Sequence, residues 1–136
     1  MQFLLMQHNK VILIVDDEFI ILESLRIQIS RILPDVVLLE AASSGEEAIQ
    51  LIDEFQNENK NLVLVISDFH LDDLKGTDIL KHAVSKFPSV EKVILSGQSN
   101  AELIEQFKND YGLTAVINKP WDFGEIQDII LPLVKS

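Results

Sequence analysis

Cysteine is absent from the 136 residues of the chain, which excludes a disulfide framework, a thiolate zinc site, an iron–sulfur cluster and a cysteine nucleophile. Basic residues are also scarce: 11 lysines and arginines stand against 22 aspartates and glutamates, for a formal net charge of −11. Nucleic-acid backbones and anionic lipid surfaces bind clustered positive charge, so we expect neither as a direct partner. With only 5 glycines and 4 prolines, the chain has no glycine- or proline-rich linker.

Long apolar runs are missing too. The run from Leu62 to Ile66 has about a quarter of the length that a membrane span needs, and the short apolar start at residues 1–6 lacks the basic flank of a signal peptide. We therefore expect a cytoplasmic protein without a membrane segment. The length predicts one domain over residues 1–136, with a core over about 9–135 and residues 1–8 as an N-terminal extension.

Short apolar runs and amphipathic stretches alternate five times along the chain. The runs are rich in β-branched residues without polar alternation and predict strands buried on both faces, as in a parallel sheet, at residues 11–15, 36–39, 62–66, 93–95 and 115–117. Apolar stripes of helical period predict helices over residues 18–33, 45–57, 76–87, 100–111 and 122–134. This alternation predicts an α/β fold with helices on both faces of a parallel sheet, joined by right-handed crossovers.

Several residues indicate where these helices begin and end. Capping-box spacing occurs at Ser44 with Glu47, Ser99 with Glu102, and Asp122 with Glu125. Pro34 and Pro88 are expected to follow the first and third helices, and Pro132 to end or kink the last one.

Polar residues stand where four of the five predicted strands end, which is the edge at which open α/β sheets bind ligands. They are Asp16, Asp17 and Glu18, then Ser67 and Asp68, then Ser96 and Gly97, and finally Asn118, Lys119 and Pro120. Clustered carboxylates either raise one another's pKa or hold a cation, and oxygen ligands suit Mg²⁺ or Mn²⁺. A divalent ion beside a lysine and a hydroxyl suits phosphoryl transfer, in which a carboxylate can be the nucleophile. Each residue alone would be an ordinary turn or surface residue, so their coincidence is what carries the prediction.

That combination resembles the receiver domain of two-component response regulators over residues 9–135. The matching motifs are the Asp16–Asp17 pair, Asp68, Ser96 and Lys119–Pro120, with a glycine at Gly76. The resemblance implies a doubly wound (βα)5 domain of flavodoxin-like strand order 2-1-3-4-5. It also implies a signalling domain rather than an enzyme with an external substrate, because such a domain catalyses only its own phosphorylation and dephosphorylation.

The resemblance also assigns roles. Asp68 would accept phosphate, Asp17 would bind Mg²⁺ directly, Asp16 would bind it directly or through water, and the main-chain carbonyl of His70 would be a further ligand. Lys119 would pair with Asp68 and later with the phosphoryl group, and Ser96 would move to bind a phosphoryl oxygen. The donor would be a phosphohistidine of a sensor histidine kinase or a phosphotransfer protein, and a downstream effector domain or protein is a possible further partner. His70 and Gln98 would flank the attacking water, and the Lys119–Pro120 bond would be cis.

Two positions depart from the family's pattern. Asp72 replaces the proline that commonly lies four residues after the phosphoacceptor, so we expect a more mobile loop there. Val116 replaces an aromatic residue that swings inward when the hydroxyl moves. On the first helix, Ile20 and Ile27 face away from the apolar stripe and suggest a docking patch, with Trp121 packing over the start of the last helix or bordering that patch.

Three alternatives remain open. A nucleotide-binding α/β domain would need a glycine-rich loop after the first strand, where this chain has acidic residues. A Mg²⁺-dependent phosphohydrolase would need a substrate-covering insertion, and the connections are short. A receiver-like interaction module that works without phosphorylation would not need the complete residue set. Phosphotransfer followed by mass spectrometry distinguishes these readings.

Overall fold

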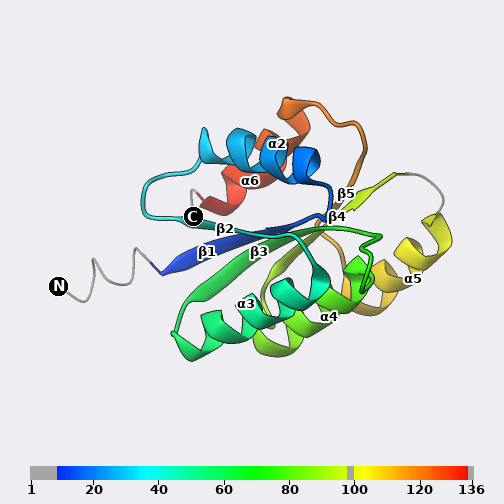
Figure 1. The fold of residues 1–136 in the computed structure, drawn as a ribbon, viewed down its shortest axis with the longest axis horizontal. Coiled ribbons are helices and arrows are strands. Elements are labelled where there is room, and N and C mark those ends of the chain that lie inside the picture. The colour runs from blue at the N-terminus through cyan, green and yellow to red at the C-terminus, as the bar shows by residue number, and fades with distance from the viewer. Residues whose placement is uncertain (1–8, 98–99, 135–136) are drawn as a thin grey trace.

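A computed structural model describes residues 9–97 and 100–134, and these form one five-stranded parallel sheet between two layers of helices (Figure 1). The strands are β1 (Lys10–Val15), β2 (Leu38–Ala42), β3 (Asn61–Asp68), β4 (Glu91–Ser96) and β5 (Ala115–Asn118). The helices in this part of the chain are α2 (Phe19–Ser30), α3 (Gly45–Asn57), α4 (Gly76–Lys86), α5 (Ala101–Tyr111) and α6 (Phe123–Val134). The sheet order β2-β1-β3-β4-β5 confirms the predicted fold class and strand order.

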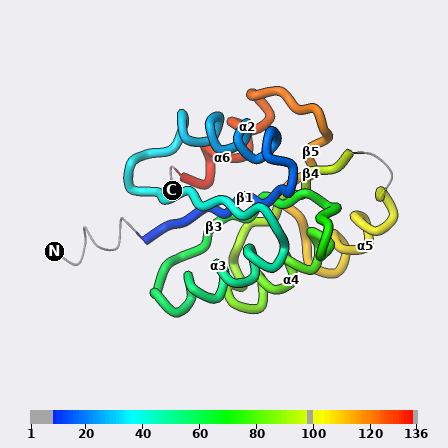
Figure 2. The backbone as a smooth tube through the Cα atoms, in the orientation of Figure 1, coloured from blue at the N-terminus to red at the C-terminus, as the bar shows by residue number. Residues whose placement is uncertain are grey.

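The helices divide between the two faces of the sheet: α2 and α6 cover one face, and α3, α4 and α5 cover the other (Figure 2). Side chains of a strand alternate between faces, so Val11, Leu13 and Val15 enter the core under α3 to α5. Ile12 and Ile14 enter the core under α2 and α6. The uninterrupted apolar run of β1 therefore supplies both cores.

The prediction that all five strands are buried on both faces is wrong for the two edge strands. Leu38 of β2 and Val116 of β5 have exposed fractions of 37% and 40%. Each edge strand has a hydrogen-bonded neighbour on one side only, and its outer flank is reached by solvent. Apolar composition alone did not distinguish these edges from the central strands.

Element boundaries agree closely with the sequence, with a few corrections. The second strand begins at Leu38 rather than Val36 and runs through Ala42. Ser67 and Asp68 are the last residues of β3 rather than the first residues after it. The first helix ends at Ser30, before Pro34, and α4 ends before Pro88. Pro132 does not end α6, which continues to Val134.

Two of the three predicted helix starts can be compared with the structure. The Ser44 hydroxyl accepts a hydrogen bond from the Glu47 N–H at 3.1 Å, and the Glu125 carboxylate accepts one from the Asp122 N–H at 3.1 Å. Ser99 lies outside the described residues, and the N-cap of α5 is Asn100. None of the helices described here is both long enough and apolar enough to span a bilayer.

Candidate functional site

Three carboxylates converge at the carboxyl end of the sheet. Asp16 and Asp17 directly follow β1, and Asp68 ends the neighbouring strand β3, whose Ser67 is paired with Val15 of β1. Asp16, Asp17 and Asp68 each present an oxygen within 4.8 Å of the others. Asp16 and Asp68 are buried. The parallel register therefore brings together acids that are about fifty residues apart in the sequence.

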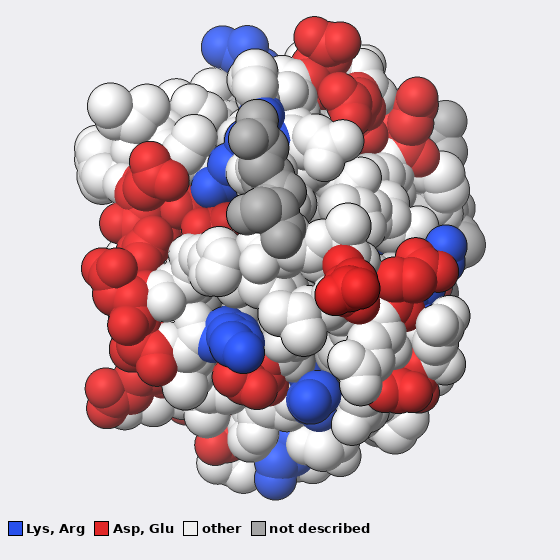
Figure 3. Space-filling view, turned by 90° about the vertical axis from the view of Figure 1, so that its right-hand side faces the viewer, with Lys and Arg blue, Asp and Glu red and all other residues white. Residues whose placement is uncertain are grey.

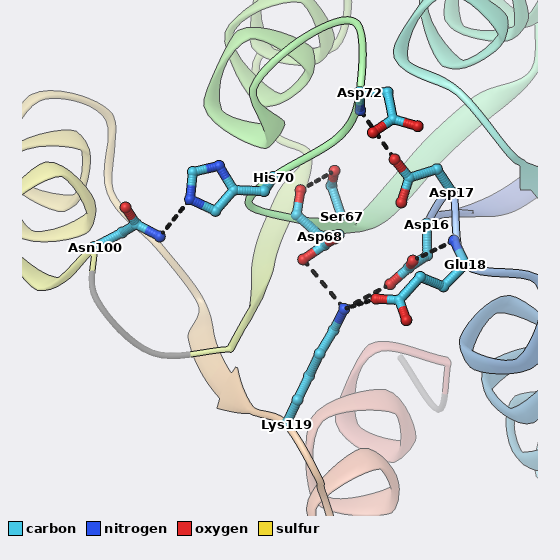
Figure 4. Close-up of polar contacts among 9 residues, drawn as sticks. All are labelled: Asp16, Asp17, Glu18, Ser67, Asp68, His70, Asp72, Asn100 and Lys119. Atoms are coloured by element: carbon cyan, nitrogen blue, oxygen red, sulfur yellow. Dashed lines mark hydrogen bonds and ion pairs between the residues drawn. The ribbon is translucent and has the colours of Figure 1, made fainter.

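Lys119 directly follows the edge strand β5, and its side chain extends from there to the acid cluster (Figure 4). Its main-chain N–H donates to the carbonyl of Ser96 at 2.9 Å, which fixes the start of the β5–α6 connection against the end of β4. Its Nζ lies 3.0 Å from Asp16 Oδ2, 3.3 Å from Asp68 Oδ1 and 3.7 Å from Glu18 Oε1. The Lys119–Pro120 bond is cis, as predicted.

Burial and mutual repulsion shift the titration of this cluster. Desolvation raises the pKa of Asp16 above 3.8, and this outweighs the hydrogen bond from the Glu18 N–H and the nearby Lys119. Desolvation also raises the pKa of Asp68, and the charges of Asp16 and Asp17 raise it further against the effect of Lys119. Burial alone would lower the pKa of Lys119, but the hydrogen bonds and charges of Asp16 and Asp68 raise it above 10.5. The cluster thus keeps a charged lysine and disfavours its own full ionisation.

Ser96 is buried at the end of β4, beside the end of β3. Within the described residues, no hydrogen bond joins its hydroxyl to Asp68 or to Lys119. Its carbonyl accepts a hydrogen bond from the Lys119 main-chain N–H. Among the described residues, the structure therefore brings Ser96 to the predicted edge without a side-chain hydrogen bond to the acids.

Gly76, at the start of α4, lies against the end of β3. Its N–H donates to the Phe69 carbonyl at 2.8 Å. A Cβ at this position would lie 2.2 Å from the Asp68 carbonyl oxygen and 3.1 Å from Ser67 Oγ. The Ser67 hydroxyl already donates to that same carbonyl oxygen at 2.9 Å. Only a glycine allows α4 to begin this close to the end of β3.

The loop between β3 and α4 surrounds the cluster with contacts that were not predicted. The Asp72 N–H donates to Asp17 Oδ2 at 2.9 Å, and the Asp73 carboxylate accepts from the first N–H groups of α3. The His70 side chain turns away from the acids and lies 2.9 Å from the Asn100 amide (Figure 4). The imidazole of His70 is therefore outside the carboxylate group, and only its main-chain carbonyl remains as the expected ligand.

The surroundings of the site are strongly acidic. Figure 3 shows the side of the molecule toward which the parallel strands run, and a band of aspartates and glutamates follows one margin of this face. Lysines and arginines are few and scattered on the same face. Such a field attracts cations and repels free anions.

Comparisons with known proteins agree with this geometry. The model of the response regulator receiver domain matches residues 12–131. The chain belongs to this family. The receiver domain is similar to the hydrogenase transcriptional regulatory protein HoxA of Cupriavidus necator, with 26% identity over 125 residues, 92% of this chain and 24% of HoxA. It spans about a quarter of the length of that curated relative.

Solved receiver structures share the fold. The signal receiver domain of an HD domain-containing protein from Pseudomonas fluorescens Pf-5 has 26% identity and a TM-score of 0.77, covering 93% of this chain and 95% of that one. A CheY-like receiver domain protein from Methanospirillum hungatei JF-1 has 27% identity and a TM-score of 0.76, covering 93% and 94%. The chain is therefore a signalling domain of two-component systems.

The receiver's α2 helix exposes more apolar surface than predicted. Ile20 and Ile27 are exposed as expected, and Phe19 beside them has an exposed fraction of 75%. Trp121 packs against the core under α2 and α6, and its indole N–H donates to Gln28 Oε1 of α2 at 2.8 Å. Trp121 therefore packs against the core that α6 shares with α2, and its hydrogen bond also places it beside the helix that carries Ile20 and Ile27.

Sequence reasoning missed Asp73 and Asn100 as neighbours of the site. Glu18 was predicted at the same edge of the sheet but was given no role, and its carboxylate lies 3.7 Å from Lys119 Nζ. Asp73 contacts the start of α3, and Asn100 contacts the His70 side chain. No sequence spacing relates either residue to the site. Gln98, expected beside the attacking water, lies outside the described residues.

Proposed function

We propose that this receiver domain accepts a phosphoryl group on Asp68 from a phosphohistidine of a sensor histidine kinase or a phosphotransfer protein. The supporting observation is that the Asp68 carboxylate, at the end of β3, lies 3.3 Å from Lys119 Nζ and within the group formed with Asp16 and Asp17. A buried carboxylate that lies beside one cation and two further acids can accept a doubly charged phosphoryl group when a metal ion balances the added charge.

Mg²⁺, or Mn²⁺ in its place, fits the donor set. Asp16, Asp17 and Asp68 offer hard oxygen ligands close enough to share one ion, and we assign the main-chain carbonyl of His70 as the fourth protein ligand. When bound, the ion supplies charge neutralisation for the phosphoryl oxygens. Burial raises the pKa of Asp68, and the charges of Asp16 and Asp17 raise it further.

The chain's own residues then have distinct tasks. An Asp68 carboxylate oxygen forms the new O–P bond as the N–P bond of the phosphohistidine breaks, and the electron pair of that bond returns to the donor imidazole. Lys119 holds Asp68 in place before transfer and stabilises a phosphoryl oxygen afterwards. Ser96 supplies a hydroxyl for another phosphoryl oxygen after moving toward Asp68. Hydrolysis by water at the same phosphorus atom would return the domain to its resting state.

The donor would dock on the exposed apolar patch of α2, formed by Phe19, Ile20 and Ile27. The patch begins directly after the Asp16–Asp17–Glu18 segment, so a protein seated there could present a phosphohistidine to the site. Phosphorylation would in turn change the surface offered to an effector domain or protein. A cytoplasmic location belongs to this proposal, because phosphohistidine formed from ATP is a cytoplasmic donor.

The test uses the purified chain and phosphoramidate, a small donor that has the N–P bond of phosphohistidine. With Mg²⁺ present, intact-mass spectrometry should show one added phosphoryl group on the wild type and none on Asp68→Asn. Asp35→Asn makes the same chemical change at an exposed loop residue and should be phosphorylated at the wild-type rate. Wild-type incorporation in Asp68→Asn would place the phosphate elsewhere, and a wild type that never accepts phosphate would favour the phosphorylation-independent interaction module.

A further inference from the structure

The loop after Asp68 makes a hydrogen bond that a typical receiver sequence cannot make. Asp72 occupies the position at which the family commonly has proline, and its main-chain N–H donates to Asp17 Oδ2 at 2.9 Å. Proline has no N–H. The second Asp17 oxygen lies on the side of Asp16 (Figure 4). The bond therefore fixes one oxygen of Asp17 and leaves the other facing the acid group.

Asp73 fixes the same loop to a different part of the fold. Its two carboxylate oxygens accept hydrogen bonds from the N–H groups of Gly45 and Glu46, each at 2.9 Å. These are N–H groups of the first turn of α3, which have no partners inside the helix. The two bonds lower the pKa of Asp73, the bond from Glu46 contributing most, so the carboxylate is charged in the resting protein.

Packing and main-chain bonds make the tether stiff. A Cβ added at Gly45 would lie 2.8 Å from Leu74, so the start of α3 and the loop are in direct contact. The loop also closes on itself, since the Leu71 N–H donates to the Leu74 carbonyl at 3.2 Å and His70 pairs with Lys75 in an antiparallel bridge. The loop is thus held by contacts within itself and to α3, although it lacks the proline.

We propose that residues 72 and 73 are positioning residues for the metal ligand Asp17, acting through two linked hydrogen-bonded contacts that proline at position 72 would not provide. The Asp72 N–H sets the orientation of the Asp17 carboxylate, and Asp73 holds that N–H in place by anchoring the loop to α3. This inference rests on the proposed function, because it takes Asp17 as a ligand of Mg²⁺. It also makes the N–H groups of Gly45 and Glu46 part of the support of the metal site.

The test compares variants that differ in one contact and carry the same charge. Asp72→Ala and Asp72→Pro both remove an exposed carboxylate, but only Asp72→Pro removes the N–H. Isothermal titration of the full chain with MgCl₂ should show affinity for Asp72→Pro about 10-fold or more below that of Asp72→Ala, the range usual for groups that orient a metal ligand. Equal affinities would overturn the role of residue 72.

A second pair tests Asp73. Asp73→Asn keeps one acceptor oxygen, whereas Asp73→Ala keeps none, and both lose the charge; Asp73→Ala should bind Mg²⁺ several-fold more weakly. Ser44→Ala is the control, because it removes a different cap of α3, the bond from the Glu47 N–H, without touching the loop. It should destabilise the protein and leave Mg²⁺ affinity unchanged. Equal Mg²⁺ affinity of Asp73→Ala and Asp73→Asn would overturn the role of residue 73.

Hydrogen exchange provides a readout that needs no metal. The Asp72 amide should exchange several-fold faster in Asp17→Ala than in the wild type, and an unchanged rate would contradict the bond as a support of Asp17.

If Asp72→Pro fails to fold by circular dichroism, an ester in place of the Leu71–Asp72 amide removes the same N–H without fixing φ, and its Mg²⁺ affinity decides. A wild type that does not bind Mg²⁺ would overturn this inference together with the metal in the proposed function, whereas a wild type that binds Mg²⁺ equally well in all variants would overturn this inference alone.

Discussion

Replacing Gly76 by alanine should disturb Asp68, the proposed phosphoacceptor, through its main chain. The added Cβ would lie 2.2 Å from the Asp68 carbonyl oxygen and 3.0 Å from its carbonyl carbon, whereas ordinary contacts of a Cβ begin at 3.4 Å. Both atoms belong to the backbone and cannot turn aside as a flexible side chain would. Either the first turn of α4 or the end of β3 must therefore move by about 1 Å.

The cost follows from what holds these two segments together. The Gly76 N–H donates to Phe69 at 2.8 Å, and Ser67 Oγ donates to the same Asp68 oxygen that the new methyl group would strike. Overpacking of a well-packed region typically costs about 1–3 kcal/mol, and more where the backbone has to shift. We expect a loss of about 2–3 kcal/mol in the free energy of unfolding.

Urea unfolding followed by circular dichroism measures this loss, with Gly124→Ala as the matched control. A Cβ at Gly124 would meet nothing within 4 Å, and the residue lies in α6, so alanine there should leave stability unchanged or raise it by up to about 1 kcal/mol. If Gly76→Ala proves as stable as Gly124→Ala, the close approach of α4 to the carbonyl of Asp68 is not a real constraint and the reasoning fails.

The same variant should affect phosphorylation beyond its effect on stability. A displaced Asp68 changes its 3.3 Å separation from Lys119 Nζ, and a misplacement of about 1 Å can lower a rate by about 100-fold. The rate of acyl phosphate formation should therefore fall at a temperature where the variant is still fully folded. A wild-type rate in folded Gly76→Ala would show that Asp68 tolerates this shift.

Three further predictions follow from the charges of the site. First, MgCl₂ at 100 times its dissociation constant should stabilise the folded chain by about 2.7 kcal/mol, or roughly 8–10 °C in Tm for a domain of this size; a Tm that ignores Mg²⁺, or an Asp17→Asn variant that responds like the wild type, would contradict this. Second, Lys119→Ala should lower the apo protein's free energy of unfolding by about 1–3 kcal/mol, because it leaves buried carboxylates without their cation, while some phosphorylation of Asp68 persists; an unchanged urea midpoint would argue against the pairing. Third, because the pKa of Asp73 is lowered in the folded protein, its carboxylate stabilises the fold at pH values above the ordinary pKa of 3.8. This stabilisation is lost as the pH falls through the lower folded pKa. Urea midpoints measured across this acid range should therefore fall less steeply in Asp73→Asn than in the wild type.

Most of the fold could be predicted because its signals are local. The α3 helix was predicted over residues 45–57 and occupies the same residues, since its apolar stripe and its Ser44 cap both lie within the segment. The β2 strand was misplaced because Val36 and Val37 are as apolar as strand residues although they precede the strand. Apolarity reports burial, and Val37 is buried outside any strand.

The site was predictable for a similar reason, and only in part. Asp16, Asp68 and Lys119 each sit at a strand end, and parallel topology brings strand ends together, so their convergence followed from the order of elements. The support of the site did not follow. Asp73 caps a helix that begins 27 to 28 residues earlier in the chain. The Asp72 contact uses a main-chain N–H, which every residue except proline has, so the sequence does not indicate that this contact forms.

The net charge of the acid group and the lysine supports the proposal that this site binds a dication. Both oxygens of Asp16 are already engaged, one by the Glu18 N–H at 2.8 Å and one by Lys119 at 3.0 Å. Lys119 also contacts Asp68, so one ammonium is shared between two buried carboxylates. Within residues 9–97 and 100–134, the hydrogen-bond donor to the Asp17 carboxylate is a neutral N–H. When fully ionised, the three carboxylates and one ammonium have a net charge of −2, which one Mg²⁺ would neutralise. Burial raises the pKa of Asp16 and Asp68 in the absence of that ion, so the resting cluster is poised between taking up protons and taking up a dication. Under the proposed function, we therefore expect phosphorylation of the buried Asp68 carboxylate to require a divalent metal ion.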